Sequence, residues 1–251
     1  MSNPTIKVLM GHRSIRQFED RQMPEGLLEE LIVCGQRAST SSNLQAYSVI
    51  HVADPERKAR LAKLCADQAQ IHQCSAFLVF CADLHRDHMA GEMHNAEWFD
   101  GDYVEALLIS SIDAALVMQN VAVAAESYGL GICMIGAMRN HPKAVGELLA
   151  LPPYVYAVSG LCIGYPAQDP ACKPRLPLEA VLHREQYLDD EAQKEYMEAY
   201  DQAMTEFYGS QGMHDRDPRW TRVMAGRTGR FHDRAELDEF LTAQGFRLRS
   251  E

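Results

Sequence analysis

Basic residues crowd into one short segment near the N-terminus of this 251-residue chain. His12, Arg13, Ser14 and Arg16 fall within the segment GHRSIRQF. Guanidinium and hydroxyl groups supply the hydrogen-bond donors that a phosphate accepts, and a bidentate arginine contact is the strongest of these. A solvated basic loop has the same composition. The segment alone therefore leaves two alternatives, an anion site and an ordinary loop.

A second basic pair, Lys173 and Arg175, lies in the segment PACKPRLP, where three prolines restrict the backbone. Two weak anion sites suggest a common ligand. Between them in the sequence lies the polar loop STSSNLQ, from Ser39 to Gln45, whose hydroxyl and amide groups could bond to a ring edge or a ribityl chain. The alternative for this loop is a hydrophilic turn.

A rival group of potential metal ligands consists of His85, Asp87, His88, Glu92 and His94. On a helix, His88 and Glu92 would lie one turn apart and could bind a metal ion. The segment lacks the His-Glu-x-x-His pattern and is better explained as a charged segment that is exposed to solvent, here called a solvated excursion. Cys133 and Cys162 fall in apolar runs, where a thiol is usually inert.

The composition limits the class of protein. With 47% hydrophobic and 24% charged residues, the chain is typical of a soluble globular protein. The net charge of −11 disfavours nucleic acid and anionic membranes as partners. The N-terminus has no apolar signal core, which predicts a cytoplasmic protein. Seven cysteines without a Cys-x-x-Cys pair predict reduced, mostly buried thiols.

The elements that must position these residues alternate between strands and helices. Short apolar runs between turn residues predict strands at 46–53, 76–82, 131–138 and 155–164. Helix-start residues or apolar periodicity predict helices from Pro24, from Pro55, from Pro142, at 191–208 and at 234–244. Residues 104–128 predict a long helix that is apolar on all sides, either a buried core helix or one that packs on a second subunit.

Four segments in register, HRSIRQF, SSNLQ, GLGICMIGAMRN and GLCIGYPAQDPACKPRLP, give the chain a family likeness. It resembles the nitroreductase family, in its oxygen-insensitive NADPH nitroreductase and flavin reductase branch. The resemblance implies an α+β fold, a mixed sheet flanked by helices, with the long central apolar helix at a dimer interface. It also implies a single FMN-binding domain over 1–251, with 191–251 as a C-terminal helical extension, and a homodimer with active sites between the subunits.

The same resemblance assigns roles to individual residues. The FMN phosphate would be held by His12, Arg13, Ser14, Lys173 and Arg175. Arg16 would face the N1 and O2 edge of the flavin, where a fixed cation stabilises the reduced, anionic ring. The remaining cofactor contacts would come from Ser39, Thr40, Ser41, Gln45, Gln68, Ile135 and Gly136. No protein acid or base is obligatory, because flavin N5 is the reacting centre.

The implied function is that of an FMN-dependent NAD(P)H oxidoreductase, which passes hydride from the nicotinamide to FMN and then to nitroaromatic, quinone or flavin acceptors in a ping-pong cycle. The alternatives are a dedicated flavin reductase, a metal-dependent hydrolase that uses His85, His88 and His94, and a non-catalytic flavin sensor. Two departures concern specificity. Asn43 stands where some relatives carry Phe. Gln211 replaces one of two arginines expected at the NADPH 2′-phosphate and Arg216 is retained, which predicts use of both NADPH and NADH.

Overall fold

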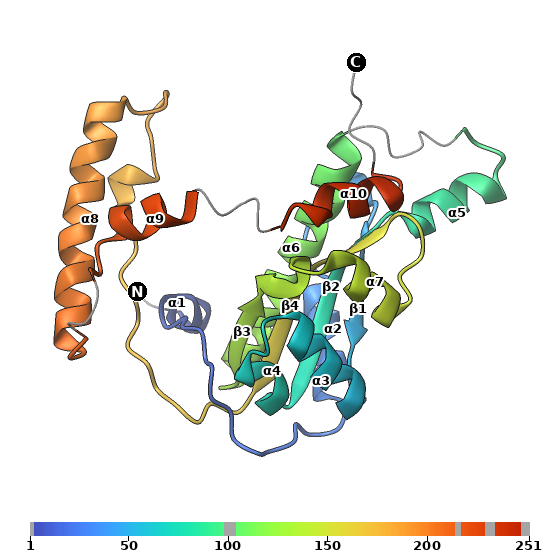
Figure 1. Cartoon of the computed structure of the whole chain (residues 1–251), viewed down its shortest axis with the longest axis horizontal. Coiled ribbons are helices and arrows are strands. Elements are labelled where there is room, and N and C mark those ends of the chain that lie inside the picture. The colour runs from blue at the N-terminus through green and yellow to red at the C-terminus, as the bar shows by residue number, and fades with distance from the viewer. Residues whose placement is uncertain (1–2, 98–103, 214–216, 229–233, 247–251) are drawn as a thin grey trace. The chain divides into compact units, whose positions relative to one another are not determined.

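The computed structural model describes residues 3–97, 104–213, 217–228 and 234–246. Its internal contacts divide the chain into a larger unit, residues 1–170 with 234–251, and a smaller unit, residues 171–233. This division does not test the expectation of a single domain with a helical extension over 191–251, which stays a prediction. The smaller unit contains α8 (Asp190–Ser210), α9 (Trp220–Thr228) and a short 3-10 turn at Leu178–Ala180 (Figure 1).

The larger unit is built on four strands, β1 (Tyr47–His51), β2 (Ala76–Asp83), β3 (Gly131–Ile135) and β4 (Val155–Gly164). Its helices are α1 (Pro4–Met10), α2 (Leu27–Gly35), α3 (Pro55–Leu64), α4 (Ala69–Gln73), α5 (His85–Met93), α6 (Val104–Ser127), α7 (Pro142–Leu149) and α10 (Glu236–Ala243). The expected strands and helices are confirmed, but α2 begins at Leu27 rather than at Pro24, and α1, α4 and α9 were not predicted. The third strand ends at Ile135, where residues 136–139 form a 3-10 turn, and α5 forms where a solvated excursion was expected.

The strands form an antiparallel sheet in the order β1-β2-β4-β3. A register shift interrupts the pairing of β2 with β4 between Phe80 and Cys81. A parallel bridge joins Ser14 to Ile132, so the N-terminal segment runs along the outer side of β3. The bridge is isolated and lies outside the named strands, whose own pairings are all antiparallel.

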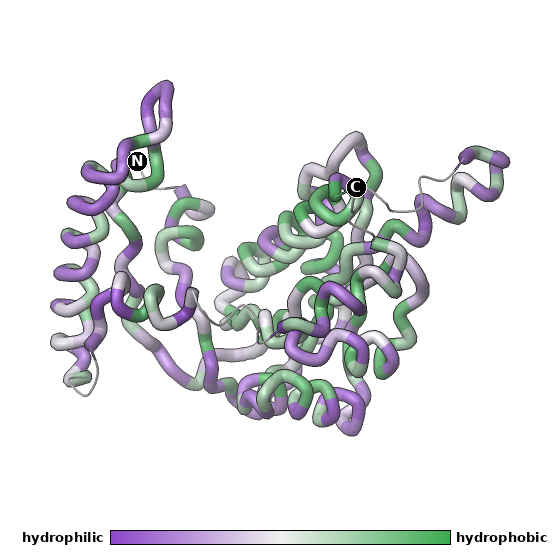
Figure 2. Tube along the Cα trace, turned by 45° about the horizontal axis from the view of Figure 1, so that its top comes forward, coloured by the Kyte–Doolittle hydropathy of each residue, from purple (hydrophilic) through white to green (hydrophobic). Residues whose placement is uncertain are grey.

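Helices cover both faces of the sheet. Along β2, alternate side chains point to opposite faces, as strand geometry requires. Phe77 and Val79 pack into a core that also includes Leu61 of α3 and Val145 of α7. Phe80 packs into the other core, with residues of α2 and α6. Figure 2 shows that α8, by contrast, is mostly hydrophilic along its length.

Of the two alternatives for the long helix α6, burial on all sides within its own chain is not observed. The face toward the sheet is buried, whereas Leu108, Ile112 and Leu116 are 47%, 53% and 43% exposed. These three residues are four positions apart and therefore lie on one face of the helix. By length and composition alone α6 could cross a membrane. Its contacts with β2 and α2 identify it as the core helix of the larger unit.

Helix starts follow local capping rules. Asp54 precedes α3, and its carboxylate accepts a hydrogen bond from the Arg57 amide at 2.7 Å. Asn3 caps α1 in the same way, through the Ile6 amide at 2.9 Å.

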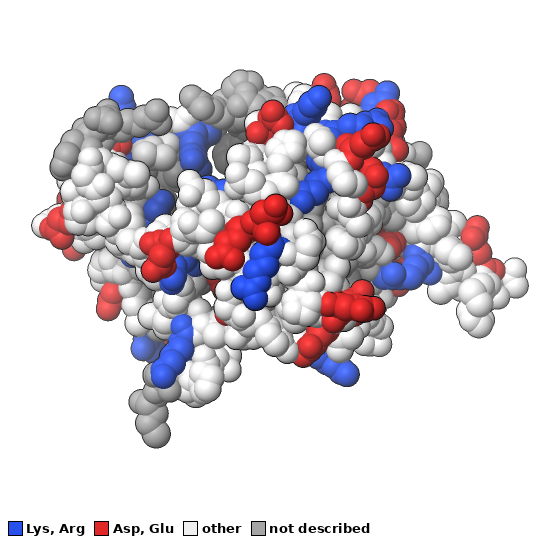
Figure 3. All heavy atoms as spheres, turned by 90° about the horizontal axis from the view of Figure 1, so that it is seen from below, with Lys and Arg blue, Asp and Glu red and all other residues white. Residues whose placement is uncertain are grey.

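On the face drawn in Figure 3, acidic and basic side chains are interspersed and do not separate into regions of one sign.

Candidate functional site

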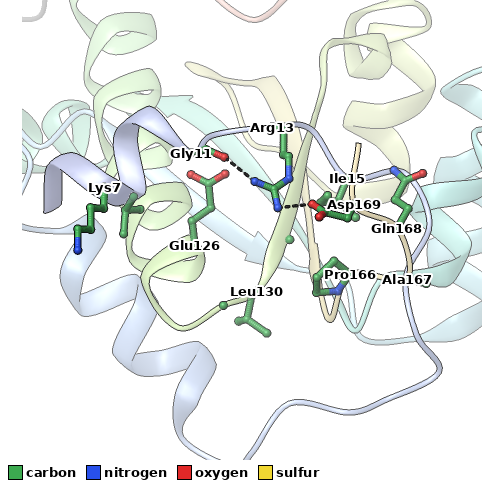
Figure 4. A pocket seen from close by; sticks show the side chains of 13 residues that line it. Lys7, Gly11, Arg13, Ile15, Glu126, Leu130, Pro166, Ala167, Gln168 and Asp169 are labelled. Atoms are coloured by element: carbon green, nitrogen blue, oxygen red, sulfur yellow. Dashed lines mark hydrogen bonds and ion pairs between the residues drawn. The ribbon is translucent and has the colours of Figure 1, made fainter. Parts of the chain in front are cut away.

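The two basic residues that open the predicted phosphate site both meet carboxylates. His12 Nδ1 lies 2.7 Å from Glu126 Oε1, at the C-terminal end of α6. The Arg13 guanidinium donates to the Gly11 carbonyl at 3.1 Å and forms an ion pair with Asp169. Arg13, Glu126 and Asp169 line a cavity of about 580 Å³, and the guanidinium points between the Gly11 carbonyl and Asp169 (Figure 4). The structure therefore places the expected basic group at a cavity whose charges are balanced.

A close backbone approach brings this segment to the sheet. The Ile15 amide donates to the Ile132 carbonyl at 2.8 Å. A Cβ atom at Gly131 would lie 2.6 Å from the Ile15 side chain, so only glycine permits this approach. Residues 12–16 are consequently fixed along the outer side of β3.

Arg16, Gln68, Gln70 and Cys133, here called the β3 site, gather around the middle of this strand. Gln70 Nε2 donates to Gln68 Oε1 at 2.8 Å and lies 4.0 Å from the Cys133 sulfur. Gln68 Nε2 donates to the Cys65 carbonyl at 2.9 Å. Burial raises the pKa of the Cys133 thiol, while nearby Arg16 and the bond from Gln70 act in the opposite direction. The site thus holds a cation and side-chain amides beside a neutral thiol.

The strand ends at the residues predicted to approach flavin N5, Ile135 and Gly136. A Cβ at Gly136 would lie 3.5 Å from Arg139 Nη2 and 4.0 Å from Arg234 Nη2. Arg234 also donates to the Gly136 carbonyl at 3.2 Å. Burial lowers the pKa of Arg139, and the neighbouring charge of Arg234 lowers it further.

Sequence reasoning missed both arginines as site residues. The motif IGAMRN contained Arg139, but nothing in the sequence pairs it with Arg234, which lies 95 positions further on. Gln70 was missed for a similar reason, since its position becomes informative only once α4 lies beside β3.

The polar loop Ser39–Gln45 is attached elsewhere on the larger unit. Its side chains from Ser41 to Gln45 are exposed, and the Ser41 amide donates to Asp113 of α6 at 3.0 Å. Residues 113 and 126 lie 13 positions apart (126 − 113) on α6, which corresponds to about 20 Å along the helix. The loop and His12 are therefore anchored at separate points of one helix.

In the smaller unit, the predicted phosphate ligands Lys173 and Arg175 have uncharged hydrogen-bond partners among the described residues. Lys173 Nζ lies 2.9 Å from the Tyr208 hydroxyl and 5.3 Å from the centre of its ring. Arg175 donates to the Lys173 carbonyl at 3.3 Å. Gln211 follows the last turn of α8 and donates to Ser210 at 3.4 Å. Arg216 lies outside the described residues.

The rival metal-binding group does not assemble in the part of the chain that the structure describes. No cluster of three or more His, Cys, Asp or Glu side chains suited to a metal ion occurs there. His88 lies 3.8 Å from Glu92, but its ring stacks on Tyr154 with 5.0 Å between the ring centres. The cysteines are free thiols, and burial raises the pKa of Cys65 and Cys81 to about 12.

The fold and the site together define an α+β protein with a basic segment fixed along the edge of its sheet. The model of the nitroreductase family matches residues 9–165, and that of the nitroreductase family C-terminal domain matches residues 173–249. The chain belongs to the nitroreductase family.

Relatives of known name are similar over nearly the whole chain. An FMN reductase [NAD(P)H] of Bacillus subtilis is 38% identical, over 98% of this chain and 99% of its own length. An oxygen-insensitive NADPH nitroreductase of Salmonella typhimurium is 37% identical, over 98% and 100%.

Solved structures agree with this assignment. The hypothetical oxidoreductase YcnD from Bacillus subtilis has a TM-score of 0.96 at 37% identity and covers 99% of this chain and 100% of its own. The NADPH:FMN oxidoreductase from Vibrio harveyi, solved in complex with NAD+, has a TM-score of 0.86 at 33% identity, covering 97% and 98%. The nitroreductase-like α+β fold is confirmed.

Proposed function

We propose that this chain is an FMN-dependent NAD(P)H oxidoreductase that reduces nitroaromatic, quinone or flavin acceptors. The names of its full-length relatives, an FMN reductase and an NADPH nitroreductase, support the reaction class. The observation that carries the assignment to particular residues is the β3 site, where Arg16 and side-chain amides from α4 converge on the strand that ends at Gly136.

The residues present fit FMN. Because Gly136 has no side chain, the space beside the Arg139 and Arg234 guanidiniums stays open. Arg13 supplies a cation at a cavity of about 580 Å³, large enough for part of a cofactor. The proposed phosphate ligands are His12, Arg13, Ser14, Lys173 and Arg175. Ser39, Thr40, Ser41 and Gln45 would line the ring system.

Bound FMN supplies the hydride transfer, so the side chains have to bind, orient and stabilise charge. Arg16 provides a fixed cation at the ring edge, and Gln68 is held by Gln70 and by the Cys65 carbonyl for a hydrogen bond to the same edge. Arg139 and Arg234 add positive charge beside Gly136. An acidic residue is not needed, because no proton has to be taken from a side chain for hydride transfer.

The proposal includes a homodimer, whose contact surface would be the exposed stripe of α6. Val104, Leu108, Ile112 and Leu116 recur every fourth residue, and each is at least 43% exposed. A second copy with the same stripe could cover it by two-fold symmetry. The 20 Å between the loop anchor and the His12 anchor also favours a flavin site completed by the loop of a second copy. Cytoplasmic localisation belongs to the same proposal.

An absorption spectrum of the purified protein tests the function. We expect flavin bands that bleach under anaerobic NADPH, and more slowly under NADH, and that return on addition of a quinone or nitroaromatic. Flavin that stays oxidised would indicate a sensor, and bound metal without flavin a hydrolase. Rates across acceptors, with free flavin among them, would separate a general reductase from a dedicated flavin reductase.

Light scattering tests the assembly. The wild-type protein should have twice the 28.2 kDa chain mass. Ile112→Asp should give a monomer, because burying an isoleucine contributes about 1.5–3 kcal/mol and an unpaired buried carboxylate opposes association. Met93→Asp, at a 78% exposed position on α5, is the matched control and should remain dimeric. A fully active wild-type monomer would overturn the dimer.

A further inference from the structure

The loop Ser39–Gln45 combines an unfavourable backbone conformation with little side-chain burial. Ser42, Asn43 and Gln45 have φ angles of 47°, 60° and 55°, in the left-handed region that side chains with a Cβ rarely adopt. Side chains 41–45 are all exposed. Burial of these side chains therefore cannot hold the loop in this shape, and polar contacts to its backbone must do so.

One buried carboxylate makes such contacts at both ends of the strained stretch. Asp113 is 1% exposed, in the middle of the apolar helix α6. Its Oδ1 accepts from the Ser41 amide at 3.0 Å, and its Oδ2 accepts from the Ala46 amide at 3.1 Å. The three left-handed residues lie between these two amides.

A buried charge in this position is costly unless the structure needs it. An ionised carboxylate loses its hydration on burial, and the loss is recovered only through strong hydrogen bonds. An apolar residue would suit the packing around Asp113, where Ala114 and Val117 are fully buried. The carboxylate is therefore explained by the amides of Ser41, within the loop, and of Ala46, directly after it, rather than by the core.

Arg86 of α5 makes a second attachment at the end of the loop. Its guanidinium donates to the Gln45 carbonyl at 3.1 Å and also to the Tyr47 carbonyl. The side chain of Arg86 is 57% exposed, so this contact lies at the surface and is weaker than the buried one.

We propose that Asp113 is a positioning residue that holds the Ser39–Gln45 loop in the shape that contacts the flavin, with Arg86 in a supporting role. This inference rests on the proposed function, in which the loop lines the FMN site. Asp113 itself touches only the loop backbone among the hydrogen bonds of the described residues. Its contribution is to remove the ordering cost that FMN would otherwise bear on binding.

Asp113→Asn tests the proposal with little change in volume. The amide retains one acceptor but turns an NH2 group toward either the Ser41 or the Ala46 amide. The FMN Kd, measured by fluorescence quenching, should rise by roughly tenfold, as for one lost hydrogen bond to a charged group. Hydrogen exchange at Ser41 and Ala46 should accelerate in the apoprotein, while exchange in β2 stays unchanged.

Ser110→Ala is the matched control, because Ser110 is also buried on α6, at 0% exposure, and its hydroxyl donates to the Ala106 carbonyl of the same helix at 2.7 Å rather than to the loop. Its FMN Kd should stay within about twofold of wild type. Equal losses of FMN affinity in both variants would overturn the proposal, because they would indicate a general loss of stability. An unchanged Kd in Asp113→Asn despite faster exchange at Ser41 would also overturn it.

Should Asp113→Asn fail to fold, Arg86→Met keeps the proposal testable, since its side chain lies at the surface. It should accelerate exchange at Tyr47 and raise the FMN Kd by about threefold, in line with an exposed polar contact. An unchanged Kd in this variant would overturn the proposal. Wild-type protein that binds no FMN would overturn the proposed function itself. If the wild-type protein binds FMN tightly and Asp113→Asn has the same Kd, only the role of Asp113 is overturned.

Discussion

The two basic clusters predicted for one phosphate differ in their charge balance. In the larger unit, His12 meets Glu126 and Arg13 meets Asp169, so each basic group has a carboxylate partner. In the smaller unit, the described partners of Lys173 are a hydroxyl group and an aromatic ring, and Arg175 donates to a backbone carbonyl.

This difference has a consequence for ligand binding. A phosphate that approaches Arg13 has to compete with Asp169, whereas one that approaches Arg175 gains a cation without displacing an anion. Coulombic attraction between unit charges is large enough near a protein surface for this competition to matter. We therefore expect the smaller unit to contribute more to FMN affinity per residue than the larger unit, although the larger unit carries the conspicuous motif.

Among the variants that test this difference between the two basic clusters, Arg175→Ala is expected to have the largest effect on FMN affinity. Loss of a charge-assisted contact with phosphate should weaken FMN binding by about 1.5–3 kcal/mol, at least tenfold in Kd. Titration of the apoprotein by fluorescence quenching measures it. Arg184→Ala removes an exposed arginine from the same unit and should leave the Kd unchanged. An equal loss in both variants would show that only net charge matters.

The next effect concerns the redox role of the larger unit. Arg16→Leu should lower the two-electron potential of bound FMN by about 30–60 mV, since 30 mV corresponds to about 1.4 kcal/mol for a two-electron couple. It should also raise the pKa of Cys133 further, because Arg16 opposes the effect of burial on that thiol. Alkylation of Cys133 in the apoprotein, followed by mass spectrometry, should then move to higher pH. An unmoved profile would show that the charge of Arg16 does not act on the Cys133 thiol.

A smaller effect is expected at the nucleotide site. With Arg216 and without a second arginine at Gln211, NADPH should be preferred over NADH by about tenfold, or about 1.4 kcal/mol. The sequence suggests that Asp217 opposes the 2′-phosphate, but hydrogen bonds from Arg219 lower the pKa of Asp217 to about 2 and compensate its charge. Arg216→Ala should abolish the preference and spare NADH turnover. The test compares kcat/KM for NADPH and NADH in the wild type and in Arg216→Ala. A preference for NADPH that persists in the variant would contradict the assignment of Arg216 to the 2′-phosphate.

Local patterns predicted much of the fold. The run at 155–164 gave the bounds of β4, and Asp54 before Pro55 marked the start of α3 through its side-chain cap. The same rule applied to Asn3 and Pro4 would have found α1, which was missed. The sequence left open whether α6 is covered entirely by its own chain or packs on a second subunit, because the composition of a helix does not reveal which apolar face its own chain covers.

The candidate site was predictable only in part, because its basic residues lie in recognisable motifs and their partners do not. Glu126 and Asp169 are distant in the sequence from His12 and Arg13, and each meets its partner only in the folded chain. Asp113 carried a weak signal, a single carboxylate within an apolar run. Its partners are backbone amides, which any sequence supplies, so spacing could not identify them.

The smallest effect tests the competition directly. Asp169→Asn removes the carboxylate that pairs with Arg13, while the guanidinium keeps its bond to the Gly11 carbonyl. The Asp169 side chain is 83% exposed, and an exposed ion pair contributes about 0.2–1 kcal/mol, so FMN should bind up to about fivefold more tightly. Asp20→Asn removes an exposed negative charge of the same unit and controls for net charge. The gain should diminish in high salt, which screens exposed charges. Weaker FMN binding in Asp169→Asn would instead mean that this carboxylate orients Arg13 for the phosphate, and the difference between the two clusters would then be one of geometry rather than of charge.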